Sequence, residues 1–278
     1  MKRLGTLLVA ALVGSATTTA PAAIINLDFG LGPAYVGDNT PANVAGAATG
    51  TQTFTPVSGD TTLSGFGTTL SLDLGRNNNG ASGTVDLTRS VTAESDSGGA
   101  GVFATDLAND ALASFSIAST TDRSPIGFEL GGLPAGDYTA FLVPFFGTYI
   151  NEDADIYAGV LAAGTTNYSD NDLSQVDYIE ADTNGFDIDG NPITIPSEVT
   201  TASWLEGSNY VSFDFTVDGT NSLYVAVEDF TNNAARDTVI ASLQVVDSVA
   251  AIPEPSSLAT LALALGGLTV RRRRRRQG

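Results

Sequence analysis

The sequence predicts an all-β fold, an antiparallel jelly-roll-like β-sandwich, and three observations point to it. Short runs alternate apolar and polar residues, as strands with one buried face do. Turns rich in Gly, Asn and Asp separate these runs at fairly regular spacing. No helical segments alternate with the runs, which argues against parallel βαβ units. No exact internal repeat is visible, which argues against a solenoid or propeller.

The clearest strand is YVSFDFTV, residues 210–217. Its apolar residues share one face: Val211, Phe213, Phe215 and Val217. A second run, SLYVAVE at 222–228, follows after DGTN, and Asp218-Gly219 is a strong turn signal. We therefore expect these two strands to pair as a hairpin.

Other candidate strands precede and follow this pair. A long alternating run, 236–246, comes just before the carboxyl-terminal segment. The earlier candidates are 23–29, 51–57, 68–74, 83–88, 112–118, 125–130 and 137–146. The stretch 93–115 interrupts the pattern, and we expect it to hold a loop with one short helix around Asp106 to Ala113.

The charge of the chain is strongly segregated. The 278 residues are 42% hydrophobic, enough to bury a core. Residues 24–250 carry thirty acids, four arginines and no lysine, a net charge of −26 within a total of −19. Such a body repels polyanions, so nucleic acid is excluded as a partner, and divalent cations or neutral polymers fit better.

Cysteine and histidine are both absent. This excludes disulfides, a thiol nucleophile, a zinc site of the usual Cys/His type and a Ser-His-Asp triad. The remaining catalytic options are paired carboxylates or an oxygen-ligated metal. Cysteine usage gives no information on the redox compartment.

The amino-terminal segment has the layout of a secretory signal peptide. Lys2 and Arg3 precede an apolar run from Leu4 to Val13, and a small-residue zone ends in Ala20-Pro21-Ala22. An amphipathic surface helix fits less well because the run is apolar all round. We expect a signal helix in residues 1–22, an ectodomain in 23–250 and a separate tail in 251–278.

The tail combines a Pro-Glu-Pro triplet, a short apolar run and a basic cluster. The run from Leu258 to Val270 has 13 residues, fewer than the roughly 20 that span a bilayer. Arginines beyond it would stay on the cytoplasmic side and hold an exported chain in the inner membrane transiently. A nucleic-acid patch fits poorly in an exported chain, whereas an uncut membrane anchor remains an alternative.

These residues closely resemble the PEP-CTERM sorting signal of Gram-negative bacteria. The matching positions are Pro253, Glu254, Pro255, Ser256, Gly266, Gly267, Arg271, Arg272, Arg273, Arg274, Arg275 and Arg276. The resemblance implies recognition by an exosortase, cleavage, and release or attachment at the cell surface and in extracellular polysaccharide.

The body shows a second, less specific resemblance. IINLDFG at 24–30, GLPAGDYTAFLVPFF at 132–146 and a last strand that runs into the tail look like the jelly-roll ectodomains that precede such tails. These ectodomains are similar to galactose-binding-like modules. The resemblance implies the fold and identifies no ligand.

An acidic stretch, 170–198, is a candidate calcium loop. Its acids partly follow the EF-hand pattern, with Asp187, Asp189, Asn191 and Glu198 at positions 1, 3, 5 and 12. Pro192 replaces the glycine that this pattern needs, so an EF-hand is disfavoured.

A looser Ca²⁺ loop remains open, with the candidate ligands Asp182, Asn184, Asp187 and Asp189. The alternative is a hairpin turn at Asp189-Gly190-Asn191 with solvated acids. NEDAD, 151–155, has the same ambiguity.

Trp204 and Tyr210 could stack on sugars if their rings were exposed, although a lone tryptophan beside strands more often packs in the interior. We therefore expect a non-enzymatic surface or matrix protein with calcium and glycan contacts as open possibilities. The competing hypothesis is a secreted carbohydrate-active enzyme that uses paired carboxylates.

Overall fold

The computed structural model describes residues 24–76, 84–95, 100–105, 107–115, 125–145, 154–165, 167–169, 177–181, 202–228 and 237–248. The chain divides into a unit of residues 21–252 and a unit of residues 1–20 and 253–278. The second unit, with the expected signal helix and the tail helix, lies outside the described residues. Within the described part, no helix has the length and apolar character to cross a membrane.

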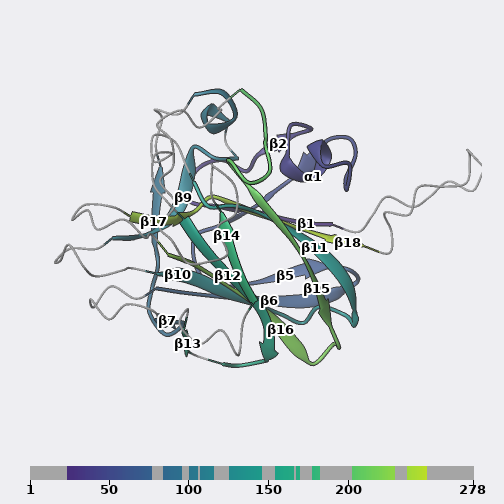
Figure 1. Ribbon diagram of the computed structural model, residues 1–278, viewed down its shortest axis with the longest axis vertical. Helices are drawn as coiled ribbons and strands as arrows, with labels where there is room; N and C mark the ends of the chain where they lie inside the picture. Colours follow the sequence, from purple (N-terminus) through teal and green to yellow (C-terminus); the bar gives the residue numbers. More distant parts are fainter. Residues whose placement is uncertain are drawn as a thin grey trace, which may run out of the picture. The chain divides into compact units, whose positions relative to one another are not determined.

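Two main sheets form the body (Figure 1). The five-stranded sheet has the order β15 (Val211–Val217), β11 (Gly136–Val143), β18 (Ser242–Asp247), β1 (Ile24–Phe29) and β4 (Thr55–Val57). Its neighbours are antiparallel except β1 and β4, which are parallel. Ile24 pairs with Val246, so the described chain begins and ends at one end of this sheet.

The six-stranded sheet is antiparallel throughout. Its order is β14 (Asp177–Ala181), β12 (Ala154–Ala162), β16 (Asn221–Glu228), β10 (Ile126–Gly131), β6 (Thr68–Arg76) and β5 (Thr61–Gly65). Phe29 of β1 and Phe128 of β10 are fully buried, and their ring centroids lie 6.0 Å apart. The core therefore lies between the two sheets, which confirms the predicted all-β, antiparallel jelly-roll-like sandwich.

Smaller elements complete the unit. They are β2 (Val36–Gly37) with β3 (Gln52–Thr53), β7 (Thr84–Asp86) with β13 (Asn167–Ser169), and β17 (Asp237–Ile240) with β9 (Asp110–Phe115) and β8 (Thr92–Ser95). A short helix α1 (Pro41–Val44) and a 3-10 turn (Gly101–Ala104) are the helical elements of the described residues. Thr40 caps α1 by accepting a hydrogen bond from the Asn43 backbone N–H, and Pro41 opens the helix.

The expected hairpin of residues 210–217 and 222–228 is wrong. Gly219 has a φ of +85° and makes the turn, but β15 pairs with β11 in one sheet, whereas β16 pairs with β10 and β12 in the other. The connection therefore crosses the sandwich. The two strands also differ in burial: β15 keeps one face partly open to solvent, whereas residues 222–227 of β16 are all buried, because both faces of that strand are covered.

Two further expectations need correction. In place of the single strand expected over 236–246, the structure has two strands, β17 and β18, which belong to different sheets and are separated by Ala241. The expected helix around Asp106 to Ala113 is absent from the described residues there, because β9 begins at Asp110 and pairs with β8 and β17. Leu112 and its alanine neighbours are fully buried on this strand, so burial outweighs their helix propensity.

A polar layer covers the outer face of the five-stranded sheet. Gln244 of β18 is 1% exposed; its Nε2 donates to Asn26 Oδ1 at 2.8 Å and its Oε1 accepts from the Ala42 N–H of α1 at 3.1 Å. Asn26 Nδ2 in turn donates to Gln52 Oε1 of β3 at 3.3 Å. These hydrogen bonds hold α1 and β3 on the sheet, because buried amides need partners.

Candidate functional site

The candidate site lies on the outer face of the six-stranded sheet. We define the acid–hydroxyl patch as Asp60, Ser71, Asp73, Glu129 and Ser222. Strand alternation places two of these residues there: the buried Leu70, Leu72 and Leu74 of β6 turn inward, so Ser71 and Asp73 turn outward. The same rule turns Glu129 outward between Phe128 and Leu130.

Carboxylates crowd together in this patch. Asp73 and Glu129 are directly opposite each other in the pairing of β6 with β10. Asp60 accepts a hydrogen bond from the Leu74 backbone N–H at 2.9 Å. Partial burial, and then the nearby charges of Asp60 and Glu129, raise the pKa of Asp73 above its ordinary value. Raised carboxyl pKa values are common at functional sites, which makes this the patch to test first.

Glu129 is nearly buried and is held by a loop. It is 7% exposed, and its Oε1 accepts the Gly164 backbone N–H at 3.0 Å. The adjacent Tyr224 hydroxyl donates to the Ala162 carbonyl at 3.1 Å and accepts from the Thr165 N–H at 2.8 Å. Burial, and then hydrogen bonding with Glu129, raises the pKa of Tyr224 to about 12, so the phenol stays neutral. These bonds fix residues 163–165 beside the patch.

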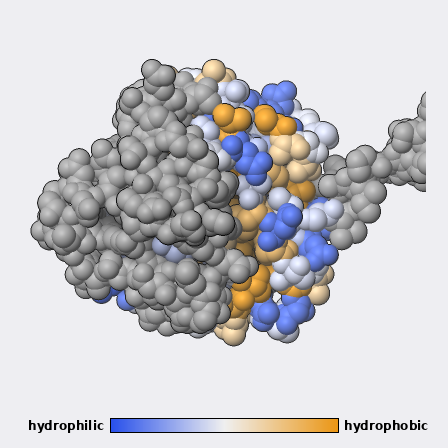
Figure 2. Space-filling view, in the orientation of Figure 1, coloured by the Kyte–Doolittle hydropathy of each residue, from blue (hydrophilic) through white to orange (hydrophobic). Residues whose placement is uncertain are grey.

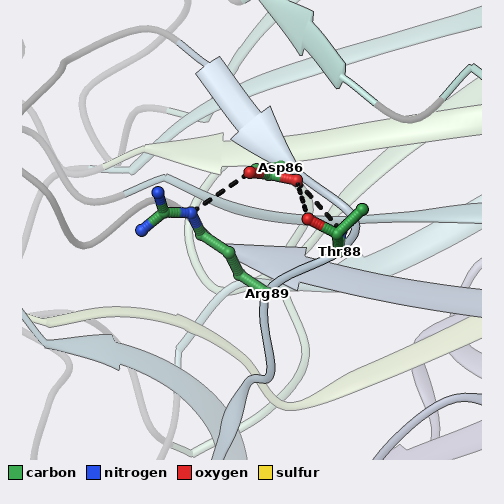
Figure 3. A network of polar contacts seen from close by, with 3 residues as sticks. All are labelled: Asp86, Thr88 and Arg89. Atoms are coloured by element: carbon green, nitrogen blue, oxygen red, sulfur yellow. Dashed lines mark hydrogen bonds and ion pairs between the residues drawn. The ribbon is translucent and has the colours of Figure 1, made fainter.

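A second segment covers the same face next to the patch. Asp86 Oδ1 accepts from the Thr88 N–H at 3.0 Å and the Thr88 hydroxyl at 2.6 Å, and Arg89 Nε lies 3.2 Å from Asp86 Oδ2 (Figure 3). The Thr88 hydrogen bonds, and then Arg89, lower the pKa of Asp86. This compact turn follows Val85, which packs in a small apolar cluster with Tyr224.

Gly75 of β6 explains how closely this segment approaches the sheet. A Cβ at this position would lie 2.5 Å from the Asp86 carbonyl oxygen and 2.5 Å from Leu87 Cα. A side chain there would push the backbone of the segment away, so a glycine is required. The patch is thus bordered by residues 163–165 and by residues 84–89, and both are attached to the sheet.

Asp73 and Glu129 project side by side from neighbouring strands of one sheet, and their carboxyl groups can accept hydrogen bonds. Within the described residues, no group of three or more acids has the arrangement of a metal site.

The predicted calcium ligands Asp182, Asn184, Asp187 and Asp189 lie outside the described residues. The same holds for the sorting-signal residues from Pro253 to Arg276. The backbone nevertheless relates two acidic stretches: β14 ends at Ala181, which pairs with Ala154 of β12. Calcium binding by the acids that follow Ala181 stays a prediction.

The tryptophan expected as a possible sugar platform is buried. Trp204 is 3% exposed and Tyr210 is 4% exposed. The indole lies edge-on to Phe103, with centroids 6.0 Å apart, and its Nε1 donates to the Asn39 carbonyl at 2.9 Å. The packing alternative is therefore correct. In the coloured part of Figure 2, hydrophobic residues lie beside hydrophilic ones.

Sequence reasoning missed the acid–hydroxyl patch. A usable signal was present in GFEL, residues 127–130, where a charged residue interrupts an otherwise apolar strand. A buried carboxylate of this kind needs partners and often marks a site. What the sequence could not provide was the register that places Glu129 opposite Asp73.

Comparisons with known proteins give only distant similarities. No protein-family model matches the chain, and no curated protein matches its sequence. The extracellular domain of ANXUR2 from Arabidopsis thaliana aligns with 82% of the chain at 12% identity and a TM-score of 0.36. The alignment covers 50% of that domain, so the chain spans half of its length.

Two carbohydrate-binding modules are also among the similar structures. A family 35 module from an environmental isolate aligns with 63% of the chain and 93% of its own length, at 16% identity and a TM-score of 0.28. TmCBM61, solved with beta-1,4-galactotriose, aligns with 50% of the chain and 72% of its own length, at 13% identity and a TM-score of 0.26. These values are too low to transfer a ligand or a function.

Proposed function

We propose that this chain is an exported, non-catalytic protein of the cell surface or extracellular matrix, sorted by its tail and associated with polysaccharide. The observation that carries the glycan part is the acid–hydroxyl patch. Sugars are polyols, and carboxylates and serine hydroxyls are their natural hydrogen-bond partners. Of these groups, the exposed Ser71 and the half-buried Asp73 are held by β6, and fixed segments border them, so little ordering is needed when a ligand binds.

The sorting part of the proposal rests on the order of the tail. Pro253-Glu254-Pro255 follows the last described strand, β18, by only a few residues, and then come the short apolar run and the arginine cluster. An exosortase would recognise the triplet while the arginines keep the tail in the inner membrane. Cleavage would then leave the β-sandwich at the surface or in extracellular polysaccharide.

Affinity electrophoresis tests the glycan part. The exported chain should be retarded in gels that contain extracellular polysaccharide from the producing cells, and Asp73→Asn should reduce the retardation. Asp214→Asn is the matched control, because it removes one exposed carboxylate from β15 in the other sheet. If both variants lost the same amount of retardation, the net charge of the chain, and not the patch, would control migration. No retardation of the unaltered chain would overturn glycan association.

Mass spectrometry tests the sorting part. The surface or secreted chain should end near Pro253 to Ser256 in cells with an exosortase and keep its full tail when that enzyme is deleted. Recovery of the arginine cluster in the mature form of normal cells would show an uncut anchor instead. Release of reducing ends from the polysaccharide, abolished by Asp73→Asn, would favour the competing carbohydrate-active enzyme.

A further inference from the structure

Four aromatic side chains form a continuous row at one end of the sandwich. Tyr138 of β11 and Phe215 of β15 are opposite each other in register, and their rings stack with centroids 5.5 Å apart. Phe66, from the turn between β5 and β6, contacts the Tyr138 ring edge-on at 5.1 Å, and Phe213 lies 6.2 Å from Phe215. We call these four residues the aromatic row. Tyr138 also pairs with Asp247, so the row lies where β18 ends.

The three phenylalanines of the aromatic row are only half-buried. Phe128 of β10 and the other core phenylalanines are fully buried between the sheets, whereas those of the row keep part of their surface in solvent. Tyr138, in contrast, is 3% exposed, and its hydroxyl donates to the Pro134 carbonyl at 2.9 Å, which fixes its ring. The row therefore has a fixed, buried centre and partly open rings on both sides of it.

Phe66 occupies a backbone position that disfavours a phenylalanine. Gly65 pairs with Thr68, so the turn has only two residues, Phe66 and Gly67, with φ of +49° and +78°. Such turns favour Asn-Gly, and a bulky side chain at positive φ is strained. Packing offsets this strain only in part, because the Phe66 ring contacts Tyr138 but stays partly exposed. A residue that breaks a local rule in this way is a candidate for a role in function.

The chemistry of the aromatic row fits uncharged sugar rings. The face of an aromatic ring carries partial negative charge and attracts the C–H groups on the apolar face of a pyranose. Carboxylates surround the row: Asp247 lies opposite Tyr138 and acts on its phenol electrostatically, and the neighbouring Asp137 is exposed. Together with the strongly acidic body, these groups repel an anionic polymer. A neutral pyranose chain meets no such repulsion.

We propose that the aromatic row binds neutral pyranose rings of a polysaccharide, with Phe66 as the ring presented to the sugar. This inference rests on the proposed glycan association and adds a second contact, which stacks on the sugar where the acid–hydroxyl patch forms hydrogen bonds to it. The turn between β5 and β6 holds the Phe66 ring at the surface before the sugar arrives, so little ordering is needed on binding.

Affinity electrophoresis with fractionated polysaccharide tests the inference. Anion exchange separates the extracellular polysaccharide of the producing cells into a neutral fraction and an anionic fraction. The neutral fraction should retard the exported chain, and Phe66→Asn should weaken this binding about 3- to 10-fold, as the loss of one aromatic contact implies. Phe66→Tyr keeps the ring and should keep the binding.

Urea unfolding separates sugar binding from a purely structural role of Phe66. Asparagine suits the turn, so a better backbone fit should offset much of the stability lost with the Tyr138 contact, and Phe66→Asn should unfold at nearly the same urea concentration as the unaltered chain. Phe66→Leu keeps an apolar side chain without an aromatic face, so it should weaken binding even if Phe66→Asn lowers stability. Leu31→Asn is the matched control and should keep the binding, because it removes an apolar side chain that is 65% exposed outside the row.

The outcomes distinguish this inference from the proposed function. Unchanged retardation of Phe66→Asn and Phe66→Leu by the neutral fraction would overturn the aromatic site and leave glycan association intact. If Phe66→Asn then also lost binding to phosphatidylcholine vesicles, the row would contact a lipid surface instead. Retardation by the anionic fraction alone, an equal loss with Leu31→Asn, or a loss confined to an unstable Phe66→Asn while Phe66→Leu binds normally would also overturn the inference. No retardation by either fraction would overturn both proposals.

Discussion

Replacement of Trp204 tests whether the tryptophan stabilises the fold or binds sugar. Trp204 lies in the segment before β15 and contacts two rings, Phe103 at 6.0 Å and Tyr210 at 6.5 Å between centroids. Its Nε1 donates to the Asn39 carbonyl, which also accepts from the Tyr35 hydroxyl at 3.2 Å. We compare Trp204→Phe, which keeps an aromatic ring, with Trp204→Ala, which removes it.

The contacts set the expected loss of stability. Trp204→Phe loses one hydrogen bond but leaves the Asn39 carbonyl paired with Tyr35, so its cost should be about 1–2 kcal/mol. Trp204→Ala also loses the two ring contacts and leaves a cavity, and truncation of a buried tryptophan costs about 3–5 kcal/mol. The difference between the variants measures the packing of the aromatic ring that Trp204→Phe keeps.

Urea unfolding followed by circular dichroism measures both values. Trp204 is the only tryptophan, so its fluorescence reports this site directly: emission should be blue-shifted, resistant to iodide quenching and unchanged when polysaccharide is added. Emission typical of exposed indole, or a large change on adding polysaccharide with both variants as stable as the unaltered chain, would refute the buried assignment.

Four further predictions concern the patch, the turn between β15 and β16, the polar layer and calcium. The pKa of Asp73 is raised in the folded state, so the folded state holds this proton more tightly than the unfolded chain does. The stabilisation by the protonated carboxyl is fully present below the ordinary pKa of 3.8 and is lost as the pH rises through the raised pKa. Asp73→Asn should therefore melt at a higher temperature than the unaltered chain at pH 7 but not near pH 3, and equal melting at pH 7 would contradict this. Asp218→Asn should melt at a lower temperature than the unaltered chain at pH 7, because hydrogen bonds from Thr220 lower the pKa of Asp218 and stabilise its ionised form in the fold. This difference should disappear as the pH falls through the lowered pKa. Gln244→Leu should cost about 2–4 kcal/mol in urea unfolding, because it leaves Asn26 Oδ1 and the Ala42 N–H without partners; a loss below about 0.5 kcal/mol would show that the polar layer is dispensable. If Asp182, Asn184, Asp187 and Asp189 bind structural calcium, EDTA should lower the melting temperature by several degrees. An unchanged melting curve would contradict the prediction of structural calcium.

The alternation of apolar and polar residues predicted most of the strands, because successive side chains of a strand point to opposite faces and only one face is buried. The expected range 68–74 lies within β6, and 125–130 matches β10 to within a residue at each end. Partners could not be predicted in the same way. The Asp218-Gly219 turn was identified correctly, but whether its strands pair or cross between sheets depends on contacts distant in sequence, such as β15 with β11.

The candidate site could likewise be predicted only in part from the sequence. The outward position of Ser71 and Asp73 follows from the leucines between which they lie. Their relation to Glu129 and Ser222 requires three strands in a fixed register. By contrast, the sequence did raise both interpretations of Trp204, and only burial could decide between them.

The central position of β18 gives the domain a mechanical property. A pull on the chain beyond Asp247 that is directed along β18 acts on five register pairs with β1 and six with β11. Such a force loads the hydrogen bonds of both neighbours in shear together, rather than opening them one at a time as peeling an edge strand would. A domain held by its carboxyl-terminal end in a moving matrix should therefore resist extension there, and β15 and β4, at the edges of the same sheet, bear none of this load directly.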